Sequence, residues 1–414
     1  MRDTDLCIVG GGPAGLACAI AATLKGLRVQ VVDGMKPPID KACGEGLLPD
    51  TLAALAQLGV RLDGSEIQPA LQDPAGAEQQ NAALGVPLEG IRFLDVGGNK
   101  DSAASKSGAM VQARFPFVQG RGVPRILLHR RLLARATELG VGFHWQTVVK
   151  GIEETGGIGQ GTGRGKPSNS QVTVHTNRGS LHARFLVGAD GSQSRVRGWA
   201  GLDRASITAR RIGLRQHYSI APWTAFVEVH WSDHGQAYVT PVSPQQVCVA
   251  FIARQKFPSV AAALACFPEL QSRLASAPPS DIPRGSITRS HKLKRVTRNH
   301  IALLGDASGS VDAVTGEGLS LCFRQALALA EALAAGDLQR YQKAHAAMRR
   351  LPHLMAGTLL LLDRSPRLRA RALALLARHP RLFARLLELH IGASPLRILD
   401  RSGQTATAQP MVSA

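Results

Sequence analysis

The chain has 414 residues, of which 44% are apolar and 19% charged, and its 49 Lys and Arg against 30 Asp and Glu give a formal charge of +19. This composition excludes a collagen-like fibre, an intrinsically disordered tail and a small disulfide scaffold. The length predicts two or three domains, or one large α/β unit with insertions, and no apolar run approaches the roughly 18 to 20 residues that span a bilayer.

The chain opens with a strand, a glycine turn and a helix. An apolar run at 6–10 ends in Gly10-Gly11-Gly12-Pro13-Ala14-Gly15, a helical pattern continues to about residue 25, and a second apolar run covers 28–33. In this spacing Gly10 permits a tight turn, Gly12 lets the backbone approach a pyrophosphate, and Gly15 allows close helix packing. The consecutive glycines also argue against a signal peptide. This pattern predicts a doubly wound, dinucleotide-binding sheet.

Asp33 closes the second strand, 18 residues after Gly15. That separation is near the ~20 residues expected for a carboxylate that accepts hydrogen bonds from an unphosphorylated adenosine ribose. The alternative is a glycine turn that binds no ligand.

The middle of the chain alternates between helices, strands and loops. We expect a helix at 51–58, one strand at 91–95 within a Gly, Ala, Gln and Ser-rich insertion, a helix at 124–139, and strands at 141–153 and 171–187. The loop at 155–170 holds six glycines and should be exposed. Its end, Gly165-Lys166-Pro167, lacks the Ser or Thr that a phosphate-binding loop requires. Strand alternation at 211–220, 225–231, 236–242 and 246–253 predicts an antiparallel meander that floors a substrate pocket.

Three further motifs follow in order. Asp190-Gly191 comes after one buried strand, Gly305-Asp306 ends another, and Thr315-Gly316-Glu317-Gly318 precedes an alanine-rich helix that reaches about residue 335. With the glycine turn, they resemble the flavin monooxygenase superfamily typified by para-hydroxybenzoate hydroxylase. The loop Lys41-Ala42-Cys43-Gly44 resembles its geranylgeranyl reductase branch.

The resemblance implies FAD as cofactor, with Asp306 on the ribityl chain, Asp190 bracing the pyrophosphate side and Arg125 opening the helix beside it. For Asp190 and Asp306, ordinary helix capping is the alternative. Independently of the family, the helix that starts near Gly318 points its positive end at whatever lies above it and would stabilise an anionic reduced flavin. The predicted cofactor-binding residues are Gly10, Gly12, Pro13, Ala14, Gly15, Asp33, Lys41, Cys43, Gly44, Arg125, Asp190, Gly305, Asp306, Gly316, Glu317 and Gly318.

The superfamily resemblance implies an FAD-dependent oxidoreductase. The first hypothesis is a monooxygenase in which NADH or NADPH transiently reduces the flavin and a C4a-hydroperoxide hydroxylates a hydrophobic, lipid-, polyketide- or aromatic-like molecule. The alternative is a reductase that saturates isoprenoid double bonds. A halogenase and a non-catalytic flavin or electron-transfer protein rank lower. Tyr238-Val239-Thr240-Pro241 keeps only the Tyr and Pro of the reductases' Tyr-x-Trp-x-Phe-Pro segment, and the halogenases' Trp-x-Trp-x-Ile-Pro is absent.

Few residues stand out for catalysis because the flavin carries the chemistry. We assign Cys43, His217 and Tyr238 as catalytic candidates, with Arg215 and His230 as other polar residues that could orient a substrate. A buried structural cysteine, or a half-buried strand His or Tyr, is the alternative for each. The scattered cysteines contain no CxxC pair, so we predict no metal site and a reducing, cytoplasmic location.

The positive charge is concentrated near the end, where residues 340–401 hold 13 Lys and Arg against 3 Asp and Glu. With so few aromatics among them, we expect no nucleic-acid partner. Segments 367–379 and 381–390 read as basic amphipathic helices separated by Pro380. Their apolar faces would be Leu368, Ala372, Leu375 and Leu376, then Leu382, Phe383, Leu386 and Leu387. These faces either pack on the body or let residues 364–390 lie on an anionic membrane.

The whole sequence predicts an α/β fold: a Rossmann-like FAD-binding domain with an inserted antiparallel substrate sheet and a C-terminal helical tail. The predicted FAD-binding parts are 1–65, 116–205 and 286–345. The insertion is 66–115, the substrate sheet 206–285 and the tail 346–400.

Overall fold

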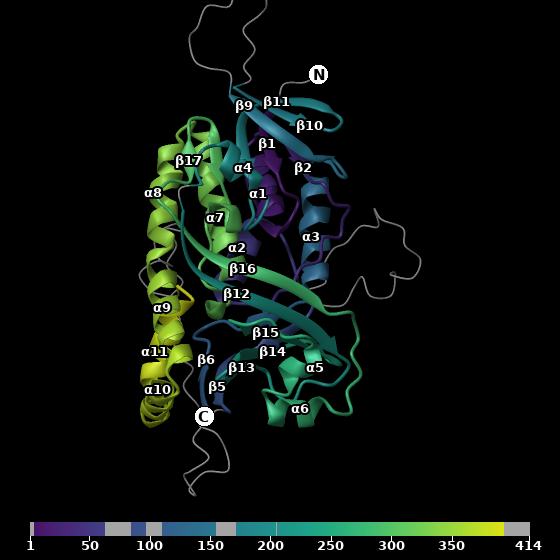
Figure 1. Cartoon of the computed structure of the whole chain (residues 1–414). Coiled ribbons are helices and arrows are strands. Elements are labelled where there is room, and N and C mark those ends of the chain that lie inside the picture. Colours follow the sequence, from purple (N-terminus) through teal and green to yellow (C-terminus); the bar gives the residue numbers. More distant parts are fainter. Residues whose placement is uncertain (1–3, 63–83, 97–109, 155–170, 204, 393–414) are drawn as a thin grey trace, which may run out of the picture.

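A computed structural model describes residues 4–62, 84–96, 110–154, 171–203 and 205–392. Two large sheets form the upper and lower parts of the molecule, and helices run along one side of both (Figure 1). The predicted α/β class, with a second sheet and a helical tail, is confirmed.

The first sheet has a parallel core in the order β18-β11-β1-β2-β8. Its strands are β1 (Thr4–Val9), β2 (Val29–Val32), β8 (Gly142–His144), β9 (Val149–Glu154), β10 (Val172–Thr176), β11 (Gly179–Gly188), β17 (Thr297–Arg298) and β18 (Ile301–Leu303). The centre of this sheet is apolar, as in 6–9 of β1 and 185–187 of β11, because both faces of a parallel sheet are covered. Helix α1 (Pro13–Leu24) packs between α3 (Arg125–Glu138) and α7 (Gly318–Ala334).

Two predicted strands are each divided in the structure. The stretch 141–153 is β8 and β9, separated at a turn where Gln146 has a φ of 53°. The stretch 171–187 is the hairpin β10–β11. The first turn lies between the apolar residues Trp145 and Val148, which hides the division, whereas the second is marked by the polar residues Asn177 and Arg178, which the prediction overlooked.

The second sheet has the order β16-β12-β15-β14-β13-β5-β6. Its strands are β5 (Gly90–Asp95), β6 (Met110–Arg114), β12 (Ala205–Tyr218), β13 (Phe226–Ser232), β14 (Gly235–Ser243), β15 (Gln246–Ala253) and β16 (Arg284–Leu293). The predicted four-strand meander is wrong in one respect, since β12 pairs with β15 and not with β13. Strand β5 pairs with β13 in parallel, so the sheet is mixed. Alternation identifies strands but does not fix which strands become neighbours.

A small third sheet joins the two layers. It consists of β3 (Gly46–Leu47), β7 (Gly120–Gly122) and β4 (Val86–Leu88), the last being a second strand in the insertion where one was predicted. Strand β16 crosses the predicted domain boundary at residue 285. The loop at 155–170 lies outside the described residues.

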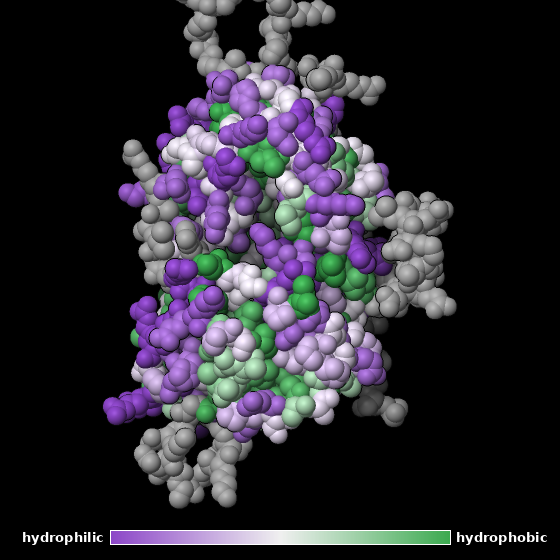
Figure 2. Space-filling view, turned by 45° about the vertical axis from the view of Figure 1, so that its right-hand side comes forward, coloured by the Kyte–Doolittle hydropathy of each residue, from purple (hydrophilic) through white to green (hydrophobic). Residues whose placement is uncertain are grey.

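The second sheet has two unlike faces. Alternate residues such as Ala237, Val239 and Val249 pack on α5 (Val260–Leu264) and α6 (Pro268–Leu274), and we call this the far face. The near face carries Arg215, His217, Tyr238 and Cys248, and the register places them in adjacent rows. On the side shown in Figure 2, apolar residues gather over the lower half of the molecule and hydrophilic residues dominate the upper half.

The remaining helices are α2 (Pro49–Gln57), α4 (Arg195–Trp199), α8 (Leu338–Met348), α9 (Arg350–Arg364), α10 (Pro366–Arg378) and α11 (Pro380–His390). Helices α8 and α9 follow each other along one side of the molecule (Figure 1). None of the helices in the described ranges is long and apolar enough to cross a membrane.

The tail helices pack on the body through a face that matches the predicted one only in part, since Phe383 and Leu387 are buried as predicted. Leu373, Phe383 and Leu387 join a core cluster with residues of β4, β6 and β13. Arg369 is 0% exposed because it pairs with Asp95 and Asp233. The buried face therefore runs through an arginine, and the predicted apolar residues Leu368, Leu375 and Leu382 lie in solvent instead.

Candidate functional site

The glycine turn after β1 has the geometry that its sequence predicts. Gly10 has a φ of 116°, in the region that favours glycine. A Cβ on Gly15 would lie 1.8 Å from the Gly10 carbonyl oxygen, so only glycine lets α1 start so close to the strand. A Cβ on Gly12 would meet no protein atom within 4 Å. Pro13 and Ala14 begin α1, whose N–H groups therefore point into open space beside Gly12.

Asp33 at the end of β2 braces this turn. Its carboxylate accepts hydrogen bonds from the Gly11 N–H at 2.7 Å and the Met35 N–H at 2.7 Å. These bonds fix the carboxylate at the edge where a ribose would lie.

Asp190 follows β11 and caps α4. Its carboxylate accepts hydrogen bonds from the N–H groups of Arg195 and Val196, at 2.7 and 3.2 Å, and from the Ser194 hydroxyl. The capping alternative is thus observed for this residue. Lys41 brings its ammonium group to the same turn, 3.2 Å from where a Cβ on Gly191 would lie.

Gly305 and Asp306 follow β18 in a short 3-10 turn (Gly305–Ser308). Gly305 has a φ of 59° and packs against Ala14 at the start of α1. The Asp306 side chain is exposed beside this contact. The two motifs, nearly 300 residues apart in the chain, therefore share one edge of the sheet.

The turn before α7 is held from below by the near face and from the side by the tail. The Tyr238 hydroxyl donates to the Val314 carbonyl at 2.7 Å, and the His390 ring lies 3.1 Å from the Thr315 carbonyl oxygen. Burial and nearby Asp50 raise the pKa of Glu317 to about 8. Since a protonated Glu317 does not offset the positive end of α7 at neutral pH, the turn favours negative charge placed above it.

These segments fit an extended dinucleotide cofactor. Cβ atoms on Gly12, Gly44, Gly316 and Gly318 would each meet no protein atom within 4 Å, so all four backbones border open space. The Nε atom of Arg125 is buried and has no hydrogen-bond partner among the described residues. We call these segments, with Asp33, Asp190 and Asp306, the cofactor cradle.

Cys43 and Glu45 lie on either side of Gly44, at the lower edge of the cradle. The Cys43 thiol is half-buried, and burial raises its pKa. Its Sγ accepts the Glu45 N–H at 3.4 Å. Glu45 has a φ of 59° and is 2% exposed, and one of its carboxylate oxygens accepts the Arg125 N–H at 3.0 Å. A non-glycine residue in this conformation is held by its surroundings.

The Glu45 carboxylate joins the cradle to the near face. It lies 2.6 Å from Nε2 of His217, whose Nδ1 lies 2.8 Å from the Asp281 carboxylate. Arg215, two residues away on β12, pairs with Asp40 at 2.9 Å and Asp281 at 3.1 Å. We call Glu45, His217 and Asp281 the proton chain. Each member lies within hydrogen-bond distance of the next, and the chain runs from a buried carboxylate to a partly exposed one.

Burial lowers the pKa of His217, but the hydrogen bonds to Glu45 and Asp281 outweigh burial and raise it above its usual value. The Glu45 side chain is 1% exposed, whereas that of Asp281 is 28% exposed. The proton chain therefore connects a buried carboxylate with solvent through one imidazole.

Three possible metal ligands also meet here, since ligand atoms of Glu45, His217 and Cys248 lie within 4.8 Å of one another. Both ring nitrogens of His217 already face carboxylates, and the Arg215 guanidinium lies 2.8 Å from the Nδ1 atom of that ring. Burial raises the pKa of the Cys248 thiol well above its usual value, so it is no ready thiolate ligand. This arrangement favours proton exchange over metal binding.

Sequence reasoning brought some of these residues together and misplaced others. His217, Arg215 and Tyr238 share the near face, as a substrate floor requires, but the Tyr238 hydroxyl already serves the turn before α7. His230 lies on the far face, paired with Glu228 at 3.1 Å, so it cannot orient a molecule in the cradle. Glu45, Asp281 and Asp40 were missed, because each meets its partner only through the fold. The signal available in the sequence was the i,i+2 spacing of Arg215 and His217, which places both side chains on one face of a strand.

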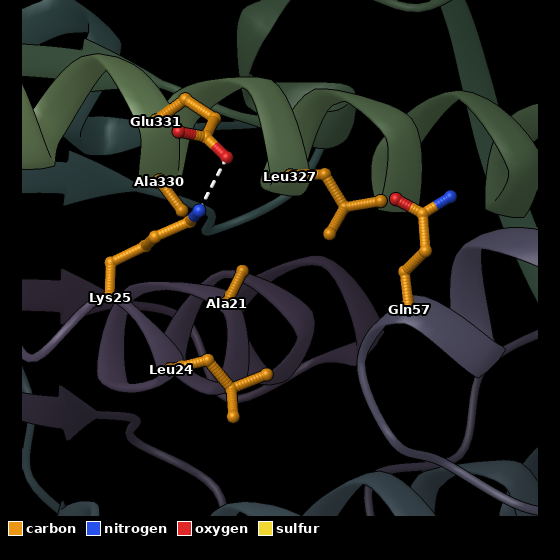
Figure 3. Close-up of a pocket in the computed structure, with 7 residues that line it drawn as sticks. All are labelled: Ala21, Leu24, Lys25, Gln57, Leu327, Ala330 and Glu331. Carbon is orange, nitrogen blue, oxygen red and sulfur yellow. Dashed lines mark ion pairs between the residues drawn. The ribbon is translucent and has the colours of Figure 1, made fainter. Parts of the chain in front are cut away.

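A surface groove lies away from the cradle, and a second one lies between the tail helices α10 and α11. The first, of about 290 Å³, runs between α1, α2 and α7, and Figure 3 shows Lys25 and Glu331 reaching across it to an ion pair of 2.6 Å. Its other lining residues are Ala21, Leu24, Gln57, Leu327 and Ala330. None of the predicted site residues lines this groove.

Comparison with known proteins gives concordant results. The profile of a family described as "FAD binding domain" matches residues 3–337. Digeranylgeranylglycerophospholipid reductase 1 of Methanopyrus kandleri is 25% identical over 358 residues, which cover 82% of this chain and 84% of the relative. The 6-methylpretetramide 4-monooxygenase of Streptomyces rimosus is 25% identical over 371 residues, covering 84% and 80%.

Among solved structures, the flavin-dependent brominase Bmp2 superimposes with a TM-score of 0.72 at 18% identity, over 94% of each chain. At this identity the likeness shows the fold.

Proposed function

The chain belongs to the FAD-binding flavoprotein family and is an FAD-dependent oxidoreductase, and we propose that it hydroxylates a hydrophobic small molecule. The cofactor prediction is confirmed by the family match. We propose that FAD lies in the cradle, because the backbones of its glycines border open space. When bound and reduced, FAD supplies the activation of molecular oxygen. We propose NADH or NADPH as the transient reductant.

Individual residues of the cradle would hold different parts of FAD. Gly12 and the start of α1 suit the pyrophosphate, Asp33 the adenosine ribose and the exposed Asp306 the ribityl chain. The turn from Gly316 to Gly318 suits the electron-accepting edge of the ring system, because it combines open backbone with the positive end of α7.

The observation that carries the proposal is the proton chain from Glu45 to Asp281. Hydroxylation of a phenol-like ring is favoured when a buried base removes the hydroxyl proton, because the anion is richer in electrons. Glu45 would accept that proton, and His217 would pass a proton on toward the exposed side of Asp281. The overall reaction consumes one oxygen molecule, one reduced nicotinamide and one proton, and yields the hydroxylated product, the oxidised nicotinamide and one water.

A second candidate is reduction of an isolated carbon–carbon double bond, and Cys43 favours it. The thiol is protonated at neutral pH because burial raises its pKa, and it lies beside Gly44 at the edge of the cradle. In this reaction the proton chain would run in the opposite direction and replace the proton given to carbon. The similarity to the Methanopyrus kandleri reductase supports this candidate.

Oxygen dependence separates the two reactions. The purified holoenzyme, reduced with dithionite under argon, would be mixed with a long-chain alkylphenol or with a geranylgeranyl lipid, and the products analysed by mass spectrometry. Hydroxylation predicts no product until air is admitted, and then a product that has gained one oxygen atom. A product formed without air that has gained two hydrogen atoms would replace hydroxylation with reduction.

A further inference from the structure

The three tail helices expose leucines at a regular interval in the sequence. Leu354, Leu361, Leu368, Leu375, Leu382 and Leu389 follow one another at intervals of seven residues, and each side chain is between 37% and 68% exposed. An exposed leucine is ordinary when single, but a repeated series on adjacent helices is not. None of these six is needed to attach the helices, because other residues form the buried face.

An arginine follows four of these leucines three positions later. The pairs are Leu361 with Arg364, Leu368 with Arg371, Leu375 with Arg378, and Leu382 with Arg385. Residues three apart on a helix lie on the same side, so each of these four leucines has a guanidinium beside it. All four arginines are exposed, and within the described ranges no acidic side chain forms an ion pair with them.

The nearest acids do not neutralise this surface. Asp363 is 2% exposed and already bound by Arg211 and Arg254. Glu388 is the other acid in residues 350–390. The exposed sides of the three tail helices therefore carry both leucines and arginines, and we call these residues together the Leu-Arg surface.

A basic groove opens within the Leu-Arg surface where α10 meets α11. It has a volume of about 630 Å³ and is lined by Arg378, His379, Pro380, Arg381, Leu382 and Arg385. Three guanidinium groups around an apolar floor can bind a phosphate group and the start of an acyl chain together.

We propose that the Leu-Arg surface docks the protein on the surface of an anionic phospholipid bilayer, with leucines entering the interface and arginines at the lipid phosphates. This combination of side chains is that of helices that lie in a membrane interface. A second copy of the chain is disfavoured as occupant because the two basic surfaces would repel. Nucleic acid would use the arginines but would leave the leucines without a role, and Phe383 is buried.

Vesicle binding tests the proposal without any substrate, so it is independent of the proposed reaction. FAD-loaded full-length protein would be sedimented at low ionic strength with vesicles of phosphatidylglycerol and phosphatidylcholine, or of phosphatidylcholine alone. We expect binding only to the anionic vesicles, and weaker binding as salt is added. The variant R371Q/R378Q/R385Q should partition about a hundredfold less.

The leucines need a separate variant and the charge needs a matched control. L368S/L375S/L382S should also lose most binding, although its charge is unchanged. K36Q/R178Q/K256Q removes the same charge from exposed positions elsewhere and should bind like the wild type. Flavin content and melting temperature should be equal in all four proteins, because every substituted side chain is exposed.

Three results would overturn the proposal. These are no sedimentation of the wild type with anionic vesicles, equal binding to neutral vesicles, or full binding by the leucine variant. The last result would mean that any polyanion is bound, nucleic acid included.

Discussion

Two histidine–carboxylate pairs are buried in the same sheet, one on each face. His230 on the far face pairs with Glu228, two residues before it on β13, and Trp223 and Arg92 complete the bonding of that carboxylate. His217 on the near face pairs with Glu45, which is 172 residues away in the chain. The far pair is bonded only to residues close to it in the sheet and in the loop before β13, whereas the near pair leads from the cofactor cradle to a partly exposed Asp281. Position relative to the cradle, and not residue type, therefore distinguishes the pair that we propose to be reactive from the one on the far face.

Removing the near carboxylate should have the largest effect. Glu45→Gln keeps the size of the side chain but takes away the proton acceptor, and a positioned acid or base is worth about 10² to 10⁴ in rate. We expect turnover to fall by that factor while flavin content is retained. Stopped-flow measurement of substrate-dependent flavin reoxidation would show it.

Glu228→Gln is the matched control on the far face. It should lower the melting temperature, because it disturbs a buried pair, and should leave turnover within a few-fold of wild type. Equal losses of turnover in Glu45→Gln and Glu228→Gln would remove the distinction between the two faces.

The near pair should also make stability depend on pH. Because the pKa of His217 is raised in the folded state, its contribution is fully present below the unfolded value of about 6.5 and is lost as pH rises through the folded value. The free energy of unfolding should thus fall by up to about 1.4 kcal/mol per pH unit between the unfolded and the folded pKa of His217. Denaturant titrations between pH 6 and 9, at one ionic strength, would measure this slope.

The variant His217→Gln supplies the comparison for that slope. It should flatten the decline above the unfolded value, since no group with a raised pKa remains at that position. An unchanged slope in His217→Gln would assign the decline to other groups.

Two tyrosines offer a smaller contrast across the same sheet. Tyr238 on the near face donates to the Val314 carbonyl, and Tyr218 on the far face donates to Gln216. Tyr238→Phe removes one hydrogen bond from the turn before α7 and should weaken FAD binding about fivefold, the equivalent of about 1 kcal/mol. Tyr218→Phe should leave FAD affinity unchanged, and fluorescence titration compares them. If both variants bind FAD equally well, Tyr238 does not support the cradle.

The backbone turns of the cradle could be predicted from the sequence better than the contacts of the near face, for a physical reason. The cradle is built from short segments whose backbone conformation is set by local residues, so each can be identified in the sequence without the others. These segments are the glycine turn, Gly305-Asp306 and Gly316 to Gly318. Glu45 and His217 acquire a role only when a loop after β2 meets β12. Strand alternation placed His217 and His230 on strands but could not say which face lies toward the cofactor.

The tail shows the same limit. Helical periodicity correctly predicted two amphipathic helices. It could not show which face packs on the rest of the protein, because that depends on residues of the sheet. Asp95 and Asp233 draw Arg369 inward, which turns Leu373 toward the core and leaves Leu368 and Leu375 outside. A buried arginine is costly without partners, and those partners are invisible in the local sequence.

The most direct test of the account is a titration of FAD into the folded apo-protein, wild type and Gly12→Val. A Cβ at Gly12 would meet no protein atom within 4 Å, so the variant should fold normally, yet its side chain would occupy the space assigned to the pyrophosphate. We predict that the wild type takes up an equimolar amount of FAD with the visible flavin absorbance, and that Gly12→Val takes up none at the same concentrations. Folded wild-type protein that binds no FAD, or equal uptake by Gly12→Val, would contradict the placement of the cofactor.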